Sequence, residues 1–408
     1  MTVSTQRAVD RWAGVPACVA LTLYRRVFRR PRPSSTIRRI LFVKLAEQGS
    51  TVLAADALRH AIEQVGREHV FFLTFEENRF ILDAMAMIPA QNILTLDVRS
   101  LVAAVRSLIV VVHRLRARRI DAAVDLEFFA RSSAILTFLS GAGARVGMHS
   151  FAGEGPYRGD LMTHRVVCNP YLHVSDMFLM MVQALAHPPE RFPAFAAVSP
   201  NTPPAQCPSA YQPSAGDVEA MQRLLHDCTR SEQVPPVILL NANSGDLVPL
   251  RRWDAARYVE LARRLLAALP EIRVVLTGGP GEVRETERLA GEIGSPRCGS
   301  VAGKTTLRQL LALYSLSRVL VTNDSGAAHF ATLTGIEVVT LFGPETPALF
   351  AARTPRNRVL WSGIVCSPCV NAFNNRLSRC RDNLCMQRIT VEDVFEATMG
   401  AYMGRDGA

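Results

Sequence analysis

The residues best suited to chemistry stand in one short run, Asn323 to His329, which directly follows an apolar, strand-like segment. The run reads NDSGAAH and is expected to open a helix, so that main-chain N–H groups and the helix dipole point at a ligand. Such a place suits a diphosphate. Asp324 and Ser325 could instead be ordinary N-cap residues. The run therefore predicts an anion site, with a helix cap as the alternative.

Two further loops could bind a nucleotide. The segment PVILLNA leads into Ser244 and then Arg251, whose guanidinium can form paired hydrogen bonds with a phosphate. The segment RVVLTGG leads into Glu282, whose carboxylate could accept hydrogen bonds from ribose hydroxyls. A polar surface loop and a carboxylate that only complements a helix N-terminus are the alternatives.

A third glycine-rich stretch does not qualify as a nucleotide-binding loop. Between Gly299 and Gly303 stand three residues, where the phosphate-binding motif GxxxxGK[ST] requires four. The stretch also follows no convincing strand. It is therefore expected to be a loop that caps the following helix.

The elements that must position these loops alternate between strand and helix. Strands are expected at 40–45, 69–75, 92–96 and 121–127, and helices at 52–65, 101–115 and 177–186. The pattern weakens where prolines crowd and then restarts, with strands at 236–242, 272–279, 318–324 and 338–343 and helices at 254–269, 282–293 and 307–316. This rhythm is typical of parallel sheets wrapped by helices. It predicts two doubly wound α/β domains in tandem, with a ligand cleft at the carboxyl ends of their strands.

The same reading divides the chain into five parts. They are a basic, partly apolar N-terminal segment (1–36), an N-terminal domain (37–200), a proline-rich linker (201–217), a C-terminal domain (218–388), and a C-terminal helix with its tail (389–408).

The formal charge of +10 is concentrated at one end of the chain. Residues 1–39 hold nine arginines against one acid, so the rest of the chain is nearly neutral. No basic face with interleaved aromatic residues is apparent, and nucleic-acid binding is therefore not expected. The apolar run 12–27 is shorter than the roughly 20 residues that span a bilayer, and the order of its parts is not that of a signal peptide. A cytoplasmic protein is expected, whose N-terminal segment either lies on an anionic membrane surface or packs on the body as a helix.

Four of the nine cysteines cluster near the C-terminus, with the spacing C-x2-C-x10-C-x4-C. The spacing leaves three alternatives open: a structural zinc site, free thiols or disulfides. The cysteines of this cluster are Cys366, Cys369, Cys380 and Cys385.

Several motifs recur in an order that resembles a known family. They read NANS…RRW, LTGGPGE, VAGKTTLRQLLAL, VTNDSGAAHFATLTG and VVTLFGPETP, within residues 237–347. Their order and spacing resemble glycosyltransferase family 9, the bacterial heptosyltransferases, and a looser resemblance extends over residues 38–398. The resemblance implies a GT-B fold of two facing Rossmann-like domains. It also implies inverting transfer that needs no metal or other cofactor, typically of heptose from ADP-heptose to a lipopolysaccharide-core glycolipid or another small acceptor.

The resemblance also implies roles for particular residues. The donor diphosphate would be held by Asp324, Ser325, Gly326 and Ala327, with His329 beside them. Glu282 would meet the ribose, and Ser244 and Arg251 would meet the phosphates, with Arg251 standing where the family often has lysine. The acceptor would lie near Lys44, Gly49, Glu127 and Arg131.

One position departs from the family pattern. Where the family usually has a Gly-Asp pair whose aspartate resembles the general base, this chain has Gly49 and Ser50. Direct displacement needs a base within about 3 Å of the attacking hydroxyl. Glu47, in the same loop, is the first candidate for that base, and Glu127 is the second. A protein that binds a nucleotide sugar without transferring it is the alternative function. An epimerase or dehydrogenase would need a glycine-rich turn after the first strand, which this chain lacks.

Overall fold

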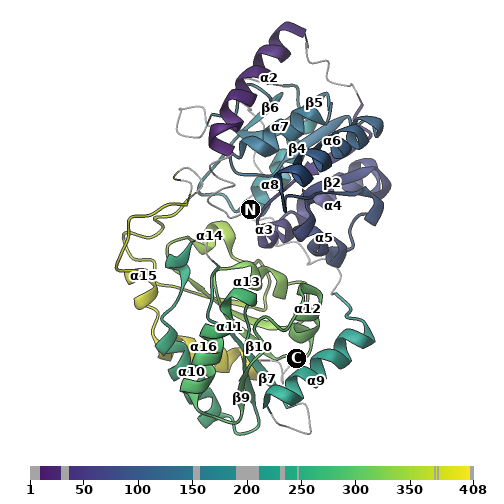
Figure 1. Ribbon diagram of the computed structural model, residues 1–408. Coiled ribbons are helices and arrows are strands. Elements are labelled where there is room, and N and C mark those ends of the chain that lie inside the picture. Colours follow the sequence, from purple (N-terminus) through teal and green to yellow (C-terminus); the bar gives the residue numbers. More distant parts are fainter. Residues whose placement is uncertain are drawn as a thin grey trace. The chain divides into compact units, whose positions relative to one another are not determined.

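A computed structural model describes residues 10–28, 36–149, 157–189, 211–229, 235–245, 248–371, 374 and 376–404. Its contacts divide the chain into two units, Met1–Pro203 and Pro204–Ala408, and each unit is described here by itself (Figure 1). Several arginines of the basic N-terminal segment (Arg7, Arg29, Arg30 and Arg32) and residues 190–210 of the proline-rich region lie outside the described residues.

The first unit is built on a six-stranded parallel sheet in the order β3-β2-β1-β4-β5-β6. Its strands are β1 (Ile40–Val43), β2 (Val70–Phe75), β3 (Ile93–Leu96), β4 (Ala122–Asp125), β5 (Ala144–His149) and β6 (His164–Val167). Its helices are α2 (Gly14–Phe28), α3 (Gln48–Val52), α4 (Ala55–Val65), α5 (Arg79–Met85), α6 (Leu101–Ala117), α7 (Arg131–Leu139) and α8 (Val174–Gln183). This strand order is that of the Rossmann fold.

Helices cover both faces of this sheet. On one face, Val111 and Leu115 of α6 and Leu136 of α7 pack in one apolar cluster with alternate strand residues such as Leu41 and Leu73. Helices α4 and α8 pack against each other, and α4 also contacts β2. Because both faces are covered, the central strands β1 and β4 are buried along their whole length and are mostly apolar, as parallel strands usually are.

The second unit repeats the architecture with strand order β12-β11-β10-β7-β8-β9. Its strands are β7 (Val237–Asn241), β8 (Arg273–Leu276), β9 (Cys298–Ser300), β10 (Val319–Asn323), β11 (Glu337–Phe342) and β12 (Asn357–Trp361). Its helices are α9 (Ala215–Thr229), α10 (Ala255–Ala268), α11 (Val283–Ile293), α12 (Leu307–Ser315), α13 (Gly326–Ala331), α14 (Pro347–Phe350), α15 (Leu384–Gln387) and α16 (Val391–Met403). One apolar cluster joins alternate strand residues to α10, α11 and α16, while α9 packs on α12 and β9.

Short 3₁₀ turns link several of these elements. They lie at Arg67–His69, Glu76–Asn78, Ala90–Asn92, Ala184–Ala186, Pro249–Arg251 and Pro280–Glu282. The last two carry Arg251 and Glu282, two of the residues expected in the donor site.

Helix α2 packs on the first unit. Its Cys18 joins an apolar cluster with Ala134 and Phe138 of α7, and Arg25 forms an ion pair with Asp160. This contact matches the packed-helix alternative for the N-terminal segment. Among the helices of the described residues, none is long and apolar enough to cross a membrane.

The structure differs from the predicted elements in three instructive places. The helix expected at 52–65 begins at Ala55, as α4, because the chain turns at 53–54; the separate helix α3 ends just before that turn. Helix α8 begins three residues before the expected start, since the His173 side chain accepts a hydrogen bond from the main-chain N–H of Ser175 and caps it. Helix α9 begins at Ala215, inside the predicted linker. It was not predicted because the neighbouring prolines indicated a linker.

Candidate functional site

The donor-side residues gather where the strand order of the second unit reverses. Strands β7 and β10 are neighbours there although they are far apart in sequence. The buried Asn323 at the end of β10 donates from Nδ2 to the main-chain oxygens of Ala242 and Asn243, at 3.1 and 3.2 Å. Its Oδ1 accepts from the main-chain N–H of Trp253 at 3.1 Å. Asn323 therefore fixes the loop after β7 against the loop after β10, at the point where open α/β sheets bind ligands.

Arg251 stands at the centre of a buried ionic cluster. Its Nε lies 3.2 Å from Oδ2 of Asp324, and its Nη2 pairs with Oε2 of Glu345. A second guanidinium, that of Arg376, lies 3.8 Å from Oε1 of Glu345 through its Nε. Two guanidinium groups and two carboxyl groups thus form one cluster of low solvent exposure, where their interactions are stronger than in water.

Burial shifts the protonation of this cluster. The pKa of Glu345 is raised to about 8, mainly by burial. The Arg251 guanidinium lowers this pKa and the nearby Asp324 carboxylate raises it. Burial also lowers the pKa of His329 to about 4. At neutral pH the His329 imidazole is therefore neutral, and burial favours the protonated form of Glu345. The more Glu345 is protonated, the better the two guanidinium groups suit an anionic ligand.

Several buried polar atoms of this site make no hydrogen bond within the described residues, although Arg251 and Asp324 form the ion pair above. They are Nδ2 of Asn243, Nε of Arg251, Oδ2 of Asp324, Nδ1 of His329 and Oε1 of Glu345. Buried polar groups usually find partners, so a group of such atoms calls for an explanation. A polar ligand that binds here supplies one.

The other donor-side residues lie on the surrounding loops. The Ser325 hydroxyl caps the short helix α13, accepting from the N–H of Ala327, and Gly326 is the first residue of that helix, which directly follows β10 and Asp324 (Figure 1). Ser244 is buried and donates weakly to the oxygen of Val248 at 3.4 Å. The structure therefore gives Ser325 the capping role that was one alternative for it.

Glu282 has a structural contact of its own. Its Oε2 accepts a hydrogen bond from the N–H of Gly279 at 2.6 Å. A Cβ atom placed on Gly278 would lie 3.0 Å from this oxygen and 3.1 Å from Nδ2 of Asn243. Glu282 and Asn243 thus flank one glycine, and only a residue without a side chain leaves the space between them open.

In the first unit, the loop after β1 forms the second cluster. Oε1 of Glu127, just after β4, accepts from the main-chain N–H groups of Leu45 and Ala46 at 2.7 and 2.8 Å and lies 3.2 Å from Nζ of Lys44. Strands β1 and β4 are neighbours where the strand order of this sheet reverses. Glu127 therefore anchors the loop and has one oxygen engaged by three donors.

Glu47 and Ser50 lie together in that loop. Glu47 is the N-cap residue of α3, with φ of 61°. Its Oε2 is 3.4 Å from Oγ of Ser50 and 3.9 Å from Nζ of Lys44. The Glu47 side chain is 27% exposed, whereas that of Lys44 is fully buried. Of the two carboxylates in this cluster, that of Glu47 is therefore easier for solvent or a ligand to reach than that of Glu127.

Gly49 and Arg131 are the other two residues that were expected on the acceptor side. Gly49 is buried within α3. Arg131 lies at the start of α7, where it pairs with Asp10 at 3.3 Å and donates to the oxygen of Tyr157 at 2.8 Å. The structure thus ties Arg131 to the N-terminal segment and brings Lys44, Glu47, Ser50 and Glu127 together without it.

Sequence reasoning missed Glu345, Arg376 and Arg158, whereas Asp125 begins the segment 125–131 that was expected on the acceptor side. Glu345 stands in the segment GPETP, directly after β11. Its place at the end of a strand could have marked it as a candidate site residue. Arg376 comes from a loop far along the chain and gave no signal. Asp125 and Arg158 form a buried ion pair in the first unit, where burial raises the pKa of Asp125 to about 6.

The four C-terminal cysteines, all within the described residues, form no disulfide with one another. Cys366 and Cys380 are exposed and Cys385 is buried. In the part of the chain that the structure describes, no group of three or more His, Cys, Asp or Glu side chains could hold a metal ion. The structure thus shows no disulfide among these four cysteines, and free thiols and structural zinc both stay predictions.

The chain matches a model of a known protein family. The sequence model described as "Glycosyltransferase family 9 (heptosyltransferase)" matches residues 109–377, more than half of the chain. Among curated proteins, lipopolysaccharide heptosyltransferase 2 of Salmonella typhimurium is 30% identical over 115 residues, which are 28% of this chain and 32% of that protein. The match thus spans about a third of that relative's length.

Solved structures resemble the whole fold. The E. coli ADP-heptose lps heptosyltransferase II superposes with a TM-score of 0.68 at 19% identity, covering 90% of this chain and 99% of that one. The E. coli heptosyltransferase WaaC with ADP-2-deoxy-2-fluoro heptose gives a TM-score of 0.58 at 17% identity, covering 88% and 99%. At these identities the likeness concerns the fold.

Proposed function

This chain belongs to glycosyltransferase family 9 (heptosyltransferase), and we propose that it transfers a heptose from ADP-heptose to a hydroxyl of a lipopolysaccharide-like glycolipid. The predicted family and the α/β fold of the GT-B type are confirmed by the family match and the solved structures. The donor, the acceptor, the stereochemistry and the place of action at the cytoplasmic membrane face are parts of the proposal.

The observation that carries the proposal is the buried ionic cluster around Arg251, beside which Nδ2 of Asn243 and Nδ1 of His329 make no hydrogen bond within the described residues. A diphosphate is a multiply charged acceptor that can take paired hydrogen bonds from a guanidinium. In the proposal, Arg251 and Arg376 neutralise the diphosphate, and Asp324 orients Arg251 through their ion pair. Ser325, Gly326 and Ala327 would form the edge of the phosphate loop, and the neutral His329 would donate or accept a hydrogen bond beside it.

Glu282 would hold the ribose of the donor. One of its oxygens is engaged by Gly279, but a carboxylate has about four acceptor sites. The open space at Gly278 would allow the nucleoside to approach the main chain. Ser244 would lie on the phosphate side of the same loop.

In the proposed reaction, the acceptor oxygen attacks the anomeric carbon of the donor from the face opposite the diphosphate. The bond from that carbon to the diphosphate oxygen breaks, its electron pair leaves with ADP, and the anomeric configuration inverts. Glu47 takes the proton of the attacking hydroxyl, because Glu127 is engaged by three donors. The Ser50 hydroxyl and Lys44 would position the Glu47 carboxylate.

The proposed transfer does not require a metal ion. Charge that develops on the leaving diphosphate would be stabilised by the preorganised guanidinium groups of Arg251 and Arg376. Structural zinc at the C-terminal cysteines would have no part in the reaction. Metal analysis of the full-length protein tests for zinc, and turnover in the presence of a chelator tests the metal independence.

Calorimetry with ADP-heptose, and with UDP-, GDP- and TDP-sugars as competitors, tests the donor. We expect micromolar binding of ADP-heptose by the wild type, lost in Asp324→Ala and kept in Glu47→Gln. ADP release with an acceptor glycolipid then tests transfer. Because Ser50 stands where the family pattern expects an aspartate, donor binding without any transfer would instead support a nucleotide-sugar-binding protein. No binding of any donor would contradict both functions.

A further inference from the structure

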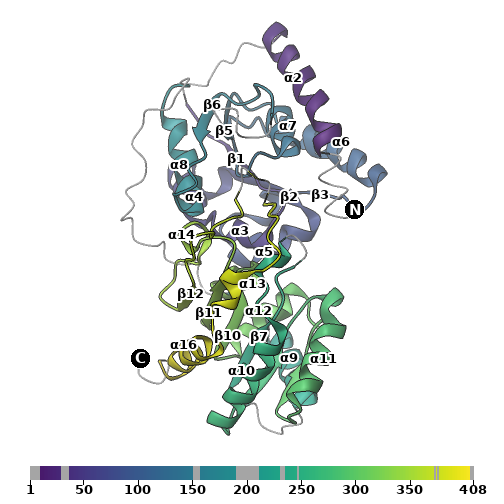
Figure 2. The same cartoon turned by 90° about the vertical axis from the view of Figure 1, so that its left-hand side faces the viewer.

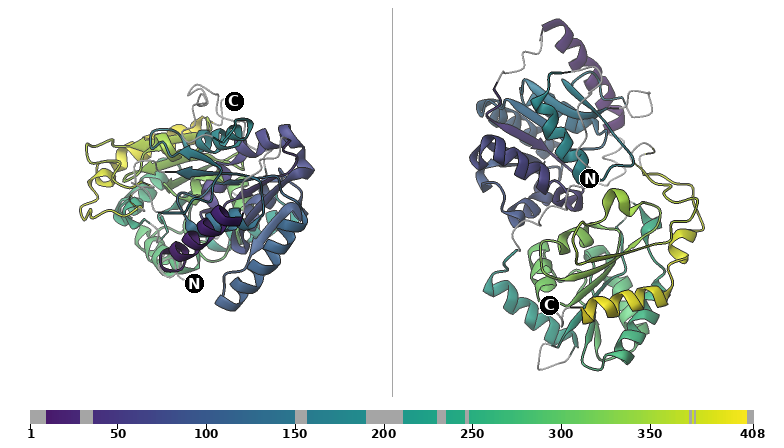
Figure 3. Two further views of the ribbon diagram at one scale, coloured as in Figure 1. Left: turned by 90° about the horizontal axis from the view of Figure 1, so that it is seen from above. Right: turned by 180° about the vertical axis from the view of Figure 1, so that it is seen from behind.

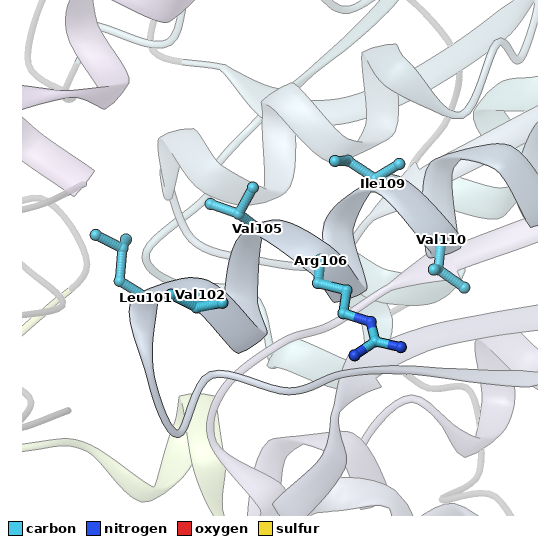
Figure 4. A pocket seen from close by; sticks show the side chains of 6 residues that line it. All are labelled: Leu101, Val102, Val105, Arg106, Ile109 and Val110. Carbon is cyan, nitrogen blue, oxygen red and sulfur yellow. The ribbon is translucent and has the colours of Figure 1, made fainter.

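Helix α6 exposes an apolar face to solvent. Val102 and Ile109 are 78% and 65% exposed, and Val105 lies between them on the same face. The buried residues Val111 and Leu115 lie on the opposite side of the helix and pack on the sheet. Together with Leu101, Val110 and Arg106, the exposed side chains line a hollow of about 500 Å³ on α6 (Figure 4). This helix is therefore apolar on both sides, whereas a surface helix is normally polar on its outer side.

Helix α2 and the residues just before it have the same property. Cys18 and Thr22 face the body, while Trp12, Leu23 and Val27 lie on the opposite side of the helix. Trp12 and Val27 are 77% and 71% exposed. Like α6, α2 is therefore apolar on its solvent-exposed side as well as on the side that packs on the body.

The two helices lie on the same side of the first unit. Helix α2 packs on α7, and α7 and α6 cover the same face of the sheet. Two of the views, from the side and from above, both show α2 and α6 on one side of this unit (Figures 2 and 3). We define the α2/α6 face by its exposed apolar residues Trp12, Val19, Leu23, Val27, Val102, Val105 and Ile109. Exposed apolar surface of this extent usually marks an interaction site.

Positive charge surrounds this face. Residues 101–119 contain Arg106, Arg114, Arg116, Arg118 and Arg119 and no acid. On α2, Arg26 is 65% exposed. The acids near α2 are engaged, since Asp10 accepts from the main-chain N–H groups of residues 131 and 132 and Asp160 pairs with Arg25. Two copies of such a face would oppose arginine to arginine, which disfavours self-association.

We propose that the α2/α6 face docks on the surface of an anionic lipid bilayer. The apolar side chains enter the boundary between headgroups and acyl chains, and the surrounding arginines contact lipid phosphates. The proposal deepens the proposed function, because a glycolipid acceptor is presented at such a surface. Vesicle binding itself requires neither donor nor acceptor, so the two proposals fail independently.

Co-sedimentation of the full-length protein with vesicles tests the proposal. We expect binding to vesicles of phosphatidylglycerol and phosphatidylethanolamine in equal parts, little binding to phosphatidylcholine vesicles, and weaker binding at high salt. Because Trp253 is buried and Trp12 is exposed, tryptophan emission should shift to shorter wavelength on binding. Trp12→Phe should remove most of that shift and retain most of the binding.

A pair of double variants separates this face from general charge effects. V102D/I109D adds two acids to α6 and should lower the affinity for the anionic vesicles by roughly tenfold or more. V365D/L377D adds the same charge at two exposed apolar residues of the second unit and should bind nearly as the wild type does. Circular dichroism melting of both variants checks that they fold.

Three results would overturn the proposal. They are no binding of the wild type to anionic vesicles, equal loss of binding in the two double variants, and a lipid-free dimer of the wild type that V102D/I109D dissociates. The last would show that a second copy of the chain occupies the face. Heptose transfer to a deacylated, water-soluble acceptor should be the same in V102D/I109D as in the wild type. If neither protein transferred heptose to this acceptor, the proposed function would be contradicted, but the proposed membrane docking would not be.

Discussion

The carboxylate Oε2 of Glu47 lies 3.4 Å from the hydroxyl Oγ of Ser50. The same hydroxyl donates to the main-chain oxygen of Glu47 at 2.9 Å, and Glu47 adopts a left-handed backbone conformation that costs an ordinary residue about 1–3 kcal/mol. Strain of this kind persists only where the surroundings impose it. The loop therefore holds a carboxylate beside the position where the family pattern has its aspartate.

Replacing Glu47 by Gln should remove the base and retain the shape of the loop. We expect kcat to fall by about 10²–10⁴-fold, with the affinity for ADP-heptose unchanged, because the donor site lies on other residues. ADP release measures the first quantity and calorimetry the second. Glu63→Gln, at an exposed glutamate of α4, is the matched control. Turnover of Glu47→Gln equal to that of the wild type would exclude Glu47 as the base.

Replacing Arg251 by Lys should weaken donor binding while keeping the charge. The lysine cannot form paired hydrogen bonds with the diphosphate, and a hydrogen bond to a charged group is worth about 1.5–3 kcal/mol, or roughly 10- to 150-fold in Kd. Calorimetry with ADP-heptose measures the loss. Arg252→Lys, at the exposed neighbouring residue, should bind the donor as the wild type does. If both variants bind equally, Arg251 is not part of the donor site.

The free energy of unfolding should depend on pH through Glu345. Because burial raises the pKa of this carboxyl from 4.5 to about 8, the folded protein keeps a proton that the unfolded chain loses between these values. This proton stabilises the folded state fully below pH 4.5, and the stabilisation is lost as the pH rises toward about 8. Over this range the free energy of unfolding should fall by at most about 1.4 kcal/mol per pH unit.

Glu345→Gln should remove this contribution. Urea unfolding of the wild type and of the variant at a series of pH values measures the difference. The contributions of Asp125 and His329, whose pKa values are also shifted, are common to both proteins and largely cancel. Parallel pH profiles of the two proteins would show that Glu345 does not titrate in this range.

Two Gly→Ala substitutions should have opposite effects on stability. A Cβ atom at Gly299 would lie 2.4 Å from the main-chain oxygen of Cys228, so β9 or α9 would have to move, at a cost of about 1–3 kcal/mol. At Gly291, within α11, a Cβ atom would meet no atom within 4 Å, and alanine should stabilise the helix by about 1 kcal/mol. Urea denaturation measures both. A stable Gly299→Ala would contradict the close packing of α9 on β9.

The order of strands and helices could be read from the sequence because local patterns carry it. Buried parallel strands such as Ile40–Val43 and Val319–Asn323 are apolar runs, and α10 and α11 have a clear helical period. Short elements without such patterns were missed, among them β9, which has three residues, and α9, which lies beside the prolines. Asp324 and Arg251 were also named from the sequence, because they stand in polar loops after predicted strands. Glu47 was named because it lies in the loop where the family resemblance implies the base.

The contacts between these residues were decided by the tertiary structure alone. Arg251, Asp324 and Glu345 follow three different strands, and only the order in which β7, β10 and β11 pair brings their side chains within ion-pair distance. The same holds for Lys44 and Glu127, which meet because β1 pairs with β4. The ion pair of Arg131 with Asp10 was likewise not visible in the sequence, and the acceptor-side role of Arg131 stays a prediction. Sequence patterns report local periodicity, whereas a site depends on which strands are neighbours, and that is fixed by packing across the whole sheet.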